Sequence, residues 1–84
     1  MKAPEITTNQ RRMMLHAIGS AVGARKKVDR NYYCEVVGCE SEKDWTDLVT
    51  RGLARPGNTI NEGRDRFYHV TEAGIDLLNA EYSP

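Results

Sequence analysis

The chain has 84 residues, of which 39% are hydrophobic and 29% charged, and its formal net charge is zero. This length is enough for one small domain with a modest core, and the composition excludes a disordered or fibrous protein. The hydrophobic runs are too short to span a bilayer, and residues 1–10 lack a secretory signal pattern, so we expect a cytoplasmic protein. We treat residues 1–84 as a single domain, with residues 1–6 and 81–84 expected to fray.

The charges are unevenly distributed along the chain. Residues 11–30 are basic and hold Arg11, Arg12, Arg25, Lys26, Lys27 and Arg30, whereas residues 31–50 are acidic and hold Glu35, Glu40, Glu42, Asp44 and Asp47. Such a distribution can present one basic and one acidic surface, and it bears on binding partners rather than on fold.

The segment from Thr7 to about Val22 is predicted to be a helix. Thr7 can cap it, and Gln10 stands three residues later in the capping-box position. Hydrophobic residues recur at helical spacing after this start: Met14, Ala17, Ile18 and Ala21. This face of the helix is expected to lie in the core.

A basic loop follows this helix over residues 24–30. Its four cations, Arg25, Lys26, Lys27 and Arg30, come just before Tyr32 and Tyr33. Positive charge beside aromatic rings is typical of a surface that contacts phosphates and stacks on bases. A solvated loop explains the same residues, because clustered cations are common on protein surfaces.

Residues 31–37 are predicted to form a short strand because they are rich in aromatic and β-branched side chains. Alternation along the strand predicts that Tyr32, Cys34 and Val36 form its buried face. Cys34 and Cys39 do not have the spacing of a zinc site, and His16 and His69 lie far from them in sequence. We therefore expect buried or partly buried free thiols, no metal and no cofactor, and histidines that make structural hydrogen bonds.

Ser41 is predicted to cap a second helix that begins with carboxylates at Glu42 and Asp44. Its hydrophobic stripe is expected to be core and consists of Trp45, Leu48 and Val49. Gly52 fits the left-handed position that ends a helix, so Leu53 is expected to pack back onto the last turn.

A β-hairpin is predicted to follow the second helix. Its parts are a strand at Leu53–Arg55, a turn at Pro56–Asn58, a polar tip at Thr59–Asp65 and a partner strand at Arg66–Val70. Thr71 is then expected to cap a final helix that runs to about Ala80. Gly74 inside that helix indicates the close approach of another backbone.

The order of these elements resembles that of a winged-helix domain of the MarR type. The resemblance is carried by LVTRGLARPG at residues 48–57 and FYHVTEAGIDLL at residues 67–78. It implies an α+β fold of about three helices with a short strand and a β-hairpin wing, in which the helix starting at Ser41 is the recognition helix. The family places a short helix before the recognition helix, whereas this chain has NYYCEVVGCE, which is predicted to be extended.

A looser resemblance links most of the chain to small uncharacterised phage and prophage proteins. These proteins combine an N-terminal helix with an Arg-Asn-aromatic segment, here Arg30, Asn31 and Tyr32. This resemblance implies an origin, and hence the cytoplasm of a host cell, more than it implies an activity.

The first functional hypothesis is a non-enzymatic module that binds a protein. The residues expected to make this contact are Glu42, Asp44 and Asp47 on the acidic helix, or Tyr32 and Tyr33 with the basic loop. It is favoured because carboxylates at the start of a recognition helix oppose docking into the major groove.

The alternative hypothesis is a nucleic-acid-binding regulator. Its expected contacts are the loop cations Arg25, Lys26, Lys27 and Arg30 together with the wing residues Arg64 and Arg66. An enzyme is not expected, because the sequence contains no Gly-rich phosphate loop, nucleophile–base pairing or metal-ligand cluster. Both a monomer and a homodimer are compatible with the hydrophobic pattern.

Overall fold

The computed structural model describes residues 6–23 and 28–81. These residues form the predicted small α+β domain, with three helices and a three-stranded antiparallel sheet. The elements are α1 (Thr8–Ala17), β1 (Tyr33–Val36), α2 (Glu42–Thr50), β2 (Ala54–Ile60), β3 (Asp65–Val70) and α3 (Glu72–Glu81). None of the helices in the described ranges is long and apolar enough to cross a membrane.

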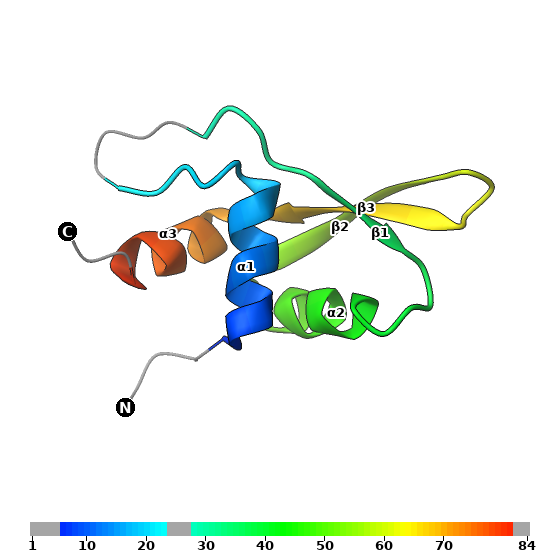
Figure 1. Ribbon diagram of the computed structural model, residues 1–84, viewed down its shortest axis with the longest axis horizontal. Helices are drawn as coiled ribbons and strands as arrows, with labels where there is room; N and C mark the ends of the chain where they lie inside the picture. The colour runs from blue at the N-terminus through cyan, green and yellow to red at the C-terminus, as the bar shows by residue number, and fades with distance from the viewer. Residues whose placement is uncertain (1–5, 24–27, 82–84) are drawn as a thin grey trace.

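The strand order in the sheet is β1-β3-β2, so β3 is the central strand and β1 and β2 form the edges. In Figure 1, α2 lies below the strands, and the β2–β3 hairpin extends beyond the helices. Because side chains alternate along each strand, one face of the sheet packs on the helices and the opposite face does not. The second face becomes important for the candidate site.

The core is built around Trp45 on α2, which is fully buried. Its ring stacks on Tyr68 of β3, with centroids 5.3 Å apart and planes 7° apart, and lies 5.2 Å from the Tyr33 ring of β1. Met14 and Leu48 are also fully buried in this cluster. The predicted core positions Met14, Ala17, Ile18, Trp45 and Leu48 are therefore confirmed. Val49 is only partly buried against this core, and Ala21 lies beyond the end of α1 and outside the core.

The start of α1 is confirmed, but its predicted end at Val22 is wrong. The Thr7 hydroxyl accepts a hydrogen bond from the Gln10 amide, and the Gln10 side chain accepts one from the Thr7 amide, each at 3.0 Å. The helix ends at Ala17 because Gly19 and Ser20 adopt left-handed backbone angles, with φ of 64° and 59°. The hydrophobic periodicity continues past this point, but the backbone does not.

The prediction that Ser41 caps α2 is wrong. Ser41 has helical backbone angles and makes no cap hydrogen bond, and its hydroxyl instead donates to Oε2 of Glu35 at 2.9 Å. The predicted end of α2 is confirmed: Gly52 has φ of 78°, and the Leu53 amide donates to the Leu48 carbonyl at 2.9 Å. This pair of features is the Schellman arrangement.

The predicted buried face of the first strand is wrong, and the strand is shorter than residues 31–37. Tyr32, Cys34 and Val36 are exposed, whereas Glu35 is only 5% exposed and Tyr33 is half-buried. Burial of the Glu35 carboxylate is supported by three donors, the amide of Val36, the thiol of Cys39 and the hydroxyl of Ser41. All three donate to Oε2 and offset part of the cost of burying the carboxylate, whose Oε1 has no hydrogen-bond partner among the described residues. Cys34, expected to be buried or partly buried, is exposed.

The predicted turn at Pro56–Asn58 is wrong, because β2 continues through these residues. The pairing of β2 with β3 shifts between Pro56 and Thr59, which marks a β-bulge, and Pro56 is accommodated because β2 is an edge strand. The chain reverses later, at Asn61 to Gly63, where all three residues have positive φ. The two paired strands of the hairpin are thus longer than predicted, and β3 begins at Asp65.

The chain ends of the described region are held in place. Ile6, expected to fray, is 7% exposed and belongs to the core, and Glu81 pairs with Arg11 at 2.7 Å. The rest of the predicted frayed segments lies outside the described residues. The predicted cap of the last helix is confirmed, since the Thr71 hydroxyl accepts a hydrogen bond from the Gly74 amide at 3.2 Å.

Gly74 packs directly against the chain that follows α2, as its position in the sequence indicated. A Cβ atom at Gly74 would overlap the Leu53 carbonyl oxygen and press on the Val70 side chain. We expect Gly74→Ala to lower the free energy of unfolding by about 2 kcal/mol, because this overlap outweighs the ~1 kcal/mol that alanine gains in a helix.

Urea denaturation of the purified domain measures this change. Ala73→Gly is the matched control, since Ala73 is exposed on the same helix and should lose only the propensity difference. A Gly74→Ala variant as stable as the wild type would contradict the packing described here.

Candidate functional site

The face of the sheet that points away from the helices carries hydrophobic side chains from all three strands. By register, Cys34 of β1 lies opposite Phe67 of β3, and Asp65 of β3 lies between Val36 of β1 and Ile60 of β2. Tyr32 joins them just before β1, with its ring edge-on to Phe67 at 6.1 Å between centroids. We call these hydrophobic residues, Tyr32, Cys34, Val36, Ile60 and Phe67, the outer sheet face.

Exposure of large hydrophobic side chains is concentrated at this face. Among the described residues four such side chains are exposed: Tyr32 (51%), Val36 (54%), Val37 (41%) and Ile60 (38%). Three of the four belong to the outer sheet face, and Val37 lies where the chain leaves β1. Scattered exposed hydrophobic residues are ordinary, but a group of them on one face is typical of a surface that contacts another molecule.

Arginines border the outer sheet face. The Arg30 guanidinium lies 5.6 Å from the centroid of the Tyr32 ring, and its Nη2 donates to the His16 carbonyl at 2.6 Å. Arg55 is exposed on β2, and Arg64 is exposed at the hairpin turn. Asp65 lies between Val36 and Ile60 on this face, and its carboxylate accepts a hydrogen bond from the Asn61 side chain.

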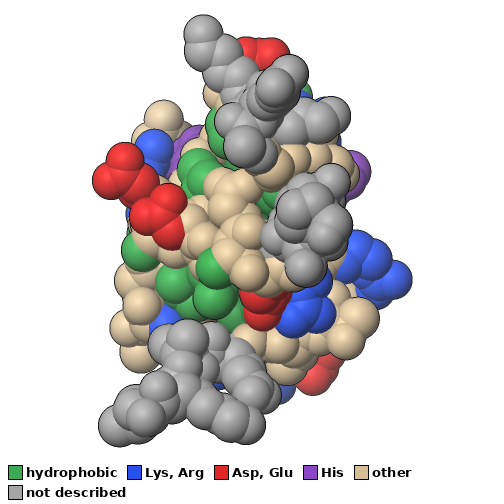
Figure 2. Space-filling view, turned by 90° about the vertical axis from the view of Figure 1, so that its left-hand side faces the viewer, with side chains coloured by type: hydrophobic (Ala, Val, Ile, Leu, Met, Phe, Trp, Pro, Cys, Tyr) green, Lys and Arg blue, Asp and Glu red, His purple; other side chains and the backbone are tan. Residues whose placement is uncertain are grey.

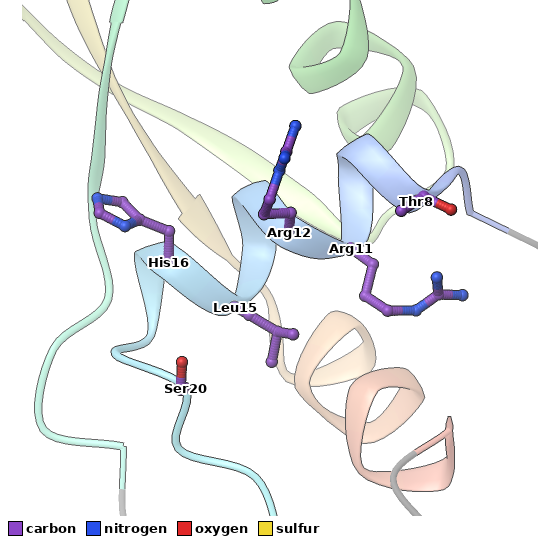
Figure 3. Close-up of a pocket in the computed structure, with 6 residues that line it drawn as sticks. All are labelled: Thr8, Arg11, Arg12, Leu15, His16 and Ser20. Carbon is purple, nitrogen blue, oxygen red and sulfur yellow. The ribbon is translucent and has the colours of Figure 1, made fainter.

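Three shallow hollows along α1 share His16 as a lining residue, and one of them borders the outer sheet face at Tyr32 and Cys34. Their volumes are about 370, 220 and 400 Å³. In Figure 3, which shows the first of them, His16 points from α1 toward the chain that leads into β1, whereas Arg11 and Leu15 point toward α3. We call the two hollows beside β1 the His16 groove, and they are lined by Asn9, Arg12, Met13, His16, Arg30, Tyr32, Tyr33 and Cys34.

The acidic residues proposed as protein contacts are engaged within the domain. The Glu42 carboxylate accepts hydrogen bonds from the Gly38 amide at 2.8 Å and the Tyr68 hydroxyl at 2.9 Å. Asp44 and Asp47 each accept a hydrogen bond at 2.8 Å from α1, from the side chains of Asn9 and Gln10 respectively, and Asp47 also pairs with Arg51 at 3.2 Å. These carboxylates join α2 to its neighbours.

Of the basic residues proposed as phosphate contacts, the three that the structure describes do not gather at one place. Arg30 precedes β1, whereas the Arg64 carbonyl accepts a hydrogen bond from the amide of Val37, at the other end of β1. Arg66 is half-buried and donates from Nη1 to the Gly57 carbonyl at 2.9 Å. Arg25, Lys26 and Lys27 lie outside the described residues.

The two tyrosines proposed as aromatic contacts have different surroundings. Tyr32 is half-exposed on the outer sheet face. Tyr33 is half-buried, with its ring between Trp45 at 5.2 Å and His16 at 5.5 Å. Tyr32 is therefore available to a ligand with part of its ring, and Tyr33 chiefly lines the wall of the groove.

Of the two histidines, His69 has the predicted structural hydrogen bond, from ring Nδ1 to the Asn31 carbonyl at 2.7 Å. His16, for which the same was expected, is instead exposed beside Tyr33. Within the described ranges, no three His, Cys, Asp or Glu side chains are grouped so that they can hold a metal ion.

A separate hydrophobic hollow lies between α1 and α3. It has a volume of about 210 Å³ and is lined by Arg11, Leu15, Val22, Leu78 and Glu81. Figure 2 shows hydrophobic side chains at the surface on the side of the molecule where α3 lies, with charged side chains near them. The Arg11–Glu81 pair closes this hollow, and the guanidinium lowers the pKa of the Glu81 carboxyl through its hydrogen bond and charge.

Comparison of the chain with protein-family models, with curated protein sequences and with solved structures found no match.

Most residues of the candidate site were not expected as binding residues from the sequence, among them Arg12, His16, Val36, Ile60 and Phe67. Arg12 and His16 are one turn apart on the polar side of α1, a spacing that places them on one face. No signal along the chain indicated that this face borders β1. Phe67 was correctly assigned to a strand, but the sequence did not show which face of the sheet it occupies. Burial of Glu35 places its neighbour Cys34, and hence Phe67 opposite Cys34, on the outer sheet face.

Tyr68 links Glu42 to the core and provides a test in alkaline solution. Burial, followed by the hydrogen bond and charge of Glu42, raises the pKa of Tyr68 to about 12. A tyrosine pKa that is raised in the folded state contributes stability that is complete below about pH 10 and is lost as the pH rises through about 12. We therefore expect stability to fall over this interval.

Absorbance titration of tyrosinate should show one group ionising near pH 12, and Tyr68→Phe should remove that step. The variant should also lose about 1 kcal/mol of stability at neutral pH, because the Glu42 carboxylate loses a donor. Tyr32→Phe is the control and should keep the late step. Burial also raises the pKa of Tyr33, so some ionisation above the ordinary tyrosine range should remain in Tyr68→Phe. An unchanged amplitude of the step near pH 12 in Tyr68→Phe would contradict the assignment.

Proposed function

We propose that this domain is a non-enzymatic module that binds another protein through the outer sheet face. The observation that carries the proposal is the grouping of Tyr32, Val36 and Ile60, all exposed among the described residues, on one face of the sheet. Hydrophobic anchors of this kind, rimmed by polar and charged residues, provide most of the affinity in protein interfaces.

The surface proposed here differs from the acidic helix that the sequence favoured. Glu42, Asp44 and Asp47 already accept hydrogen bonds from within the domain, so contact with a partner would have to compete with those bonds. Arg30 and Tyr32 remain in the proposed surface. Opposite charge on a partner would steer it toward the arginines at the rim.

We further infer that the domain is a reduced winged helix of phage type, in which β2 and β3 form the wing. The sheet order β1-β3-β2 and the position of the hairpin directly after α2 support this inference. The described residues between β1 and β2 contain the single helix α2. A reduced winged helix of this form would lack the helix that precedes the recognition helix, which favours a protein partner over the major groove.

Val36→Asp tests the proposed surface, because Val36 is 54% exposed and its replacement removes no core contact. We expect the immobilised domain to retain a defined partner from its native host, and Val36→Asp to reduce that retention at least about tenfold by burying a charge in the interface. Quantitative mass spectrometry of the retained proteins measures the effect.

Thr46→Asp is the matched control, since it places the same charge on the exposed side of α2. Thermal unfolding measures the stability of both variants, and Val36→Asp is expected to lose about 0.5 kcal/mol because its carboxylate faces Asp65 across the strands. Retention of the same proteins by the wild type and Val36→Asp would overturn the proposed function.

A second candidate function, binding of single-stranded nucleic acid, is favoured by one observation. The Arg30 guanidinium lies over Tyr32, which itself contacts Phe67, so positive charge and exposed aromatic rings occur together. Aromatic side chains beside cations are the common platform for stacking unpaired bases.

Fluorescence anisotropy with a labelled oligothymidylate tests this second function. If it operates, binding should weaken steeply as salt is raised, and Tyr32→Ala should weaken it about tenfold through the loss of one stacked base. Thr46→Ala should leave the affinity unchanged. Absence of binding at low salt would exclude the function.

A further inference from the structure

The His16 groove has a consistent electrostatic character. Its described lining contains the cations Arg12 and Arg30 together with His16, and no aspartate or glutamate lines any of the three hollows that share His16. The whole chain contains equal numbers of acidic and basic residues. A groove that is positive in a neutral protein favours an anionic occupant.

Neither Arg12 nor Arg30 forms an ion pair with another described residue, although the Asn9 amide that accepts from Arg12 also donates to the Asp44 carboxylate. Arg12 donates to the side-chain oxygen of Asn9 at 2.8 Å, and Arg30 donates to the backbone carbonyl of His16. Both acceptors are neutral, and both arginines are exposed. Arg11, the next cation along α1, is different because Glu81 pairs with it. The available positive charge therefore lies on the side of α1 that faces β1.

The groove is continuous with the outer sheet face. Tyr32 and Cys34 belong to both surfaces, so an occupant that leaves the groove along β1 meets Val36 next. One extended chain can thus contact arginines with acidic side chains and then the sheet with hydrophobic ones. This continuity connects the charge of the groove to the hydrophobic surface used in the proposed function.

We propose that the His16 groove binds an extended acidic segment of the partner protein, with aspartate or glutamate side chains on Arg12 and Arg30. The inference rests on the proposed function, since hydrophobic residues of the same partner would cover the outer sheet face. A guanidinium binds a carboxylate through paired hydrogen bonds, which gives such a contact both strength and direction.

The aromatic geometry favours carboxylates over a nucleic acid strand in this groove. The Tyr33 ring is occupied by Trp45 and by the edge contact with His16, so it has little free face on which a base can stack. Arg30 already covers one face of Tyr32. Exposed Val36, further along, fits a hydrophobic side chain and provides nothing for a phosphate.

The test measures binding of a labelled oligoglutamate peptide. Binding of an oligothymidylate of similar length is measured separately for comparison. Backbone amide NMR of the wild type should show shifts at Arg12, His16 and Cys34 when oligoglutamate is added. We expect Arg12→Glu and Arg30→Glu each to weaken this binding about three- to tenfold, because each replaces an attraction by a repulsion.

Lys43→Glu is the matched control, since it makes the same change of charge on α2, where the Lys43 side chain is 77% exposed. It should bind oligoglutamate like the wild type. The inference is overturned if the two arginine variants bind like Lys43→Glu, if the shifts lie outside the groove, or if oligothymidylate binds more tightly than oligoglutamate.

Failure of this inference can be distinguished from failure of the proposed function. Val36→Asp lies outside the groove lining and tests the outer sheet face through retention of the partner. Loss of the partner in Val36→Asp, with no effect of Arg12→Glu or Arg30→Glu on either probe, overturns the acidic-segment inference alone. The converse result overturns the proposed function and leaves the anionic groove supported.

Discussion

The stacking of Trp45 on Tyr68 determines how the rest of the domain is arranged. The two rings are nearly parallel and fully enclosed, and they join α2 to the central strand of the sheet. The Tyr33 ring also packs against Trp45, and this contact fixes which face of β1 lies toward the core. Tyr32, Cys34 and Val36 must then point away from the helices. The surface proposed for binding is therefore a consequence of the aromatic core.

Glu35 completes this constraint from the opposite direction. Its carboxylate is buried beside the core and accepts hydrogen bonds from the Cys39 thiol and the Ser41 hydroxyl, which belong to the turn between β1 and α2. Removing a carboxylate from water is unfavourable unless donors replace the lost hydration. The turn provides these donors, and in doing so it uses the hydroxyl that would otherwise cap α2.

Local patterns predicted those parts of the structure in which neighbouring residues determine the result. The capping box at Thr7, the left-handed Gly52 and the buried Trp45 all follow from spacing within one or two helical turns. Gly74 was explained correctly because a glycine inside a helix usually has a packing reason.

Predictions failed where a distant residue decided between two locally acceptable arrangements. A glutamate in a short strand is expected to face solvent, but Glu35 is buried because Cys39 and Ser41 of the following turn donate hydrogen bonds to it. Pro56 looks like the start of a turn, but Arg66 of the facing strand donates to the Gly57 carbonyl and keeps β2 in the sheet through a bulge. The candidate site has the same character. Arg12 and Tyr33 are far apart in the sequence and line one hollow only because α1 packs beside β1.

The distribution of charge along the chain is a poor guide to the charge of its surfaces, and the reason is visible in α2. The acidic half of the sequence places Asp44 and Asp47 against α1, where Asn9 and Gln10 donate to them. Hydrogen bonds to ionised groups are among the stronger polar contacts, so these carboxylates mainly hold α2 against α1. The cations Arg12 and Arg30 have only neutral acceptors and stay available at the groove. A chain with no net charge can in this way have a locally basic surface, because Asp44 and Asp47 accept hydrogen bonds within the domain whereas Arg12 and Arg30 donate only to neutral groups.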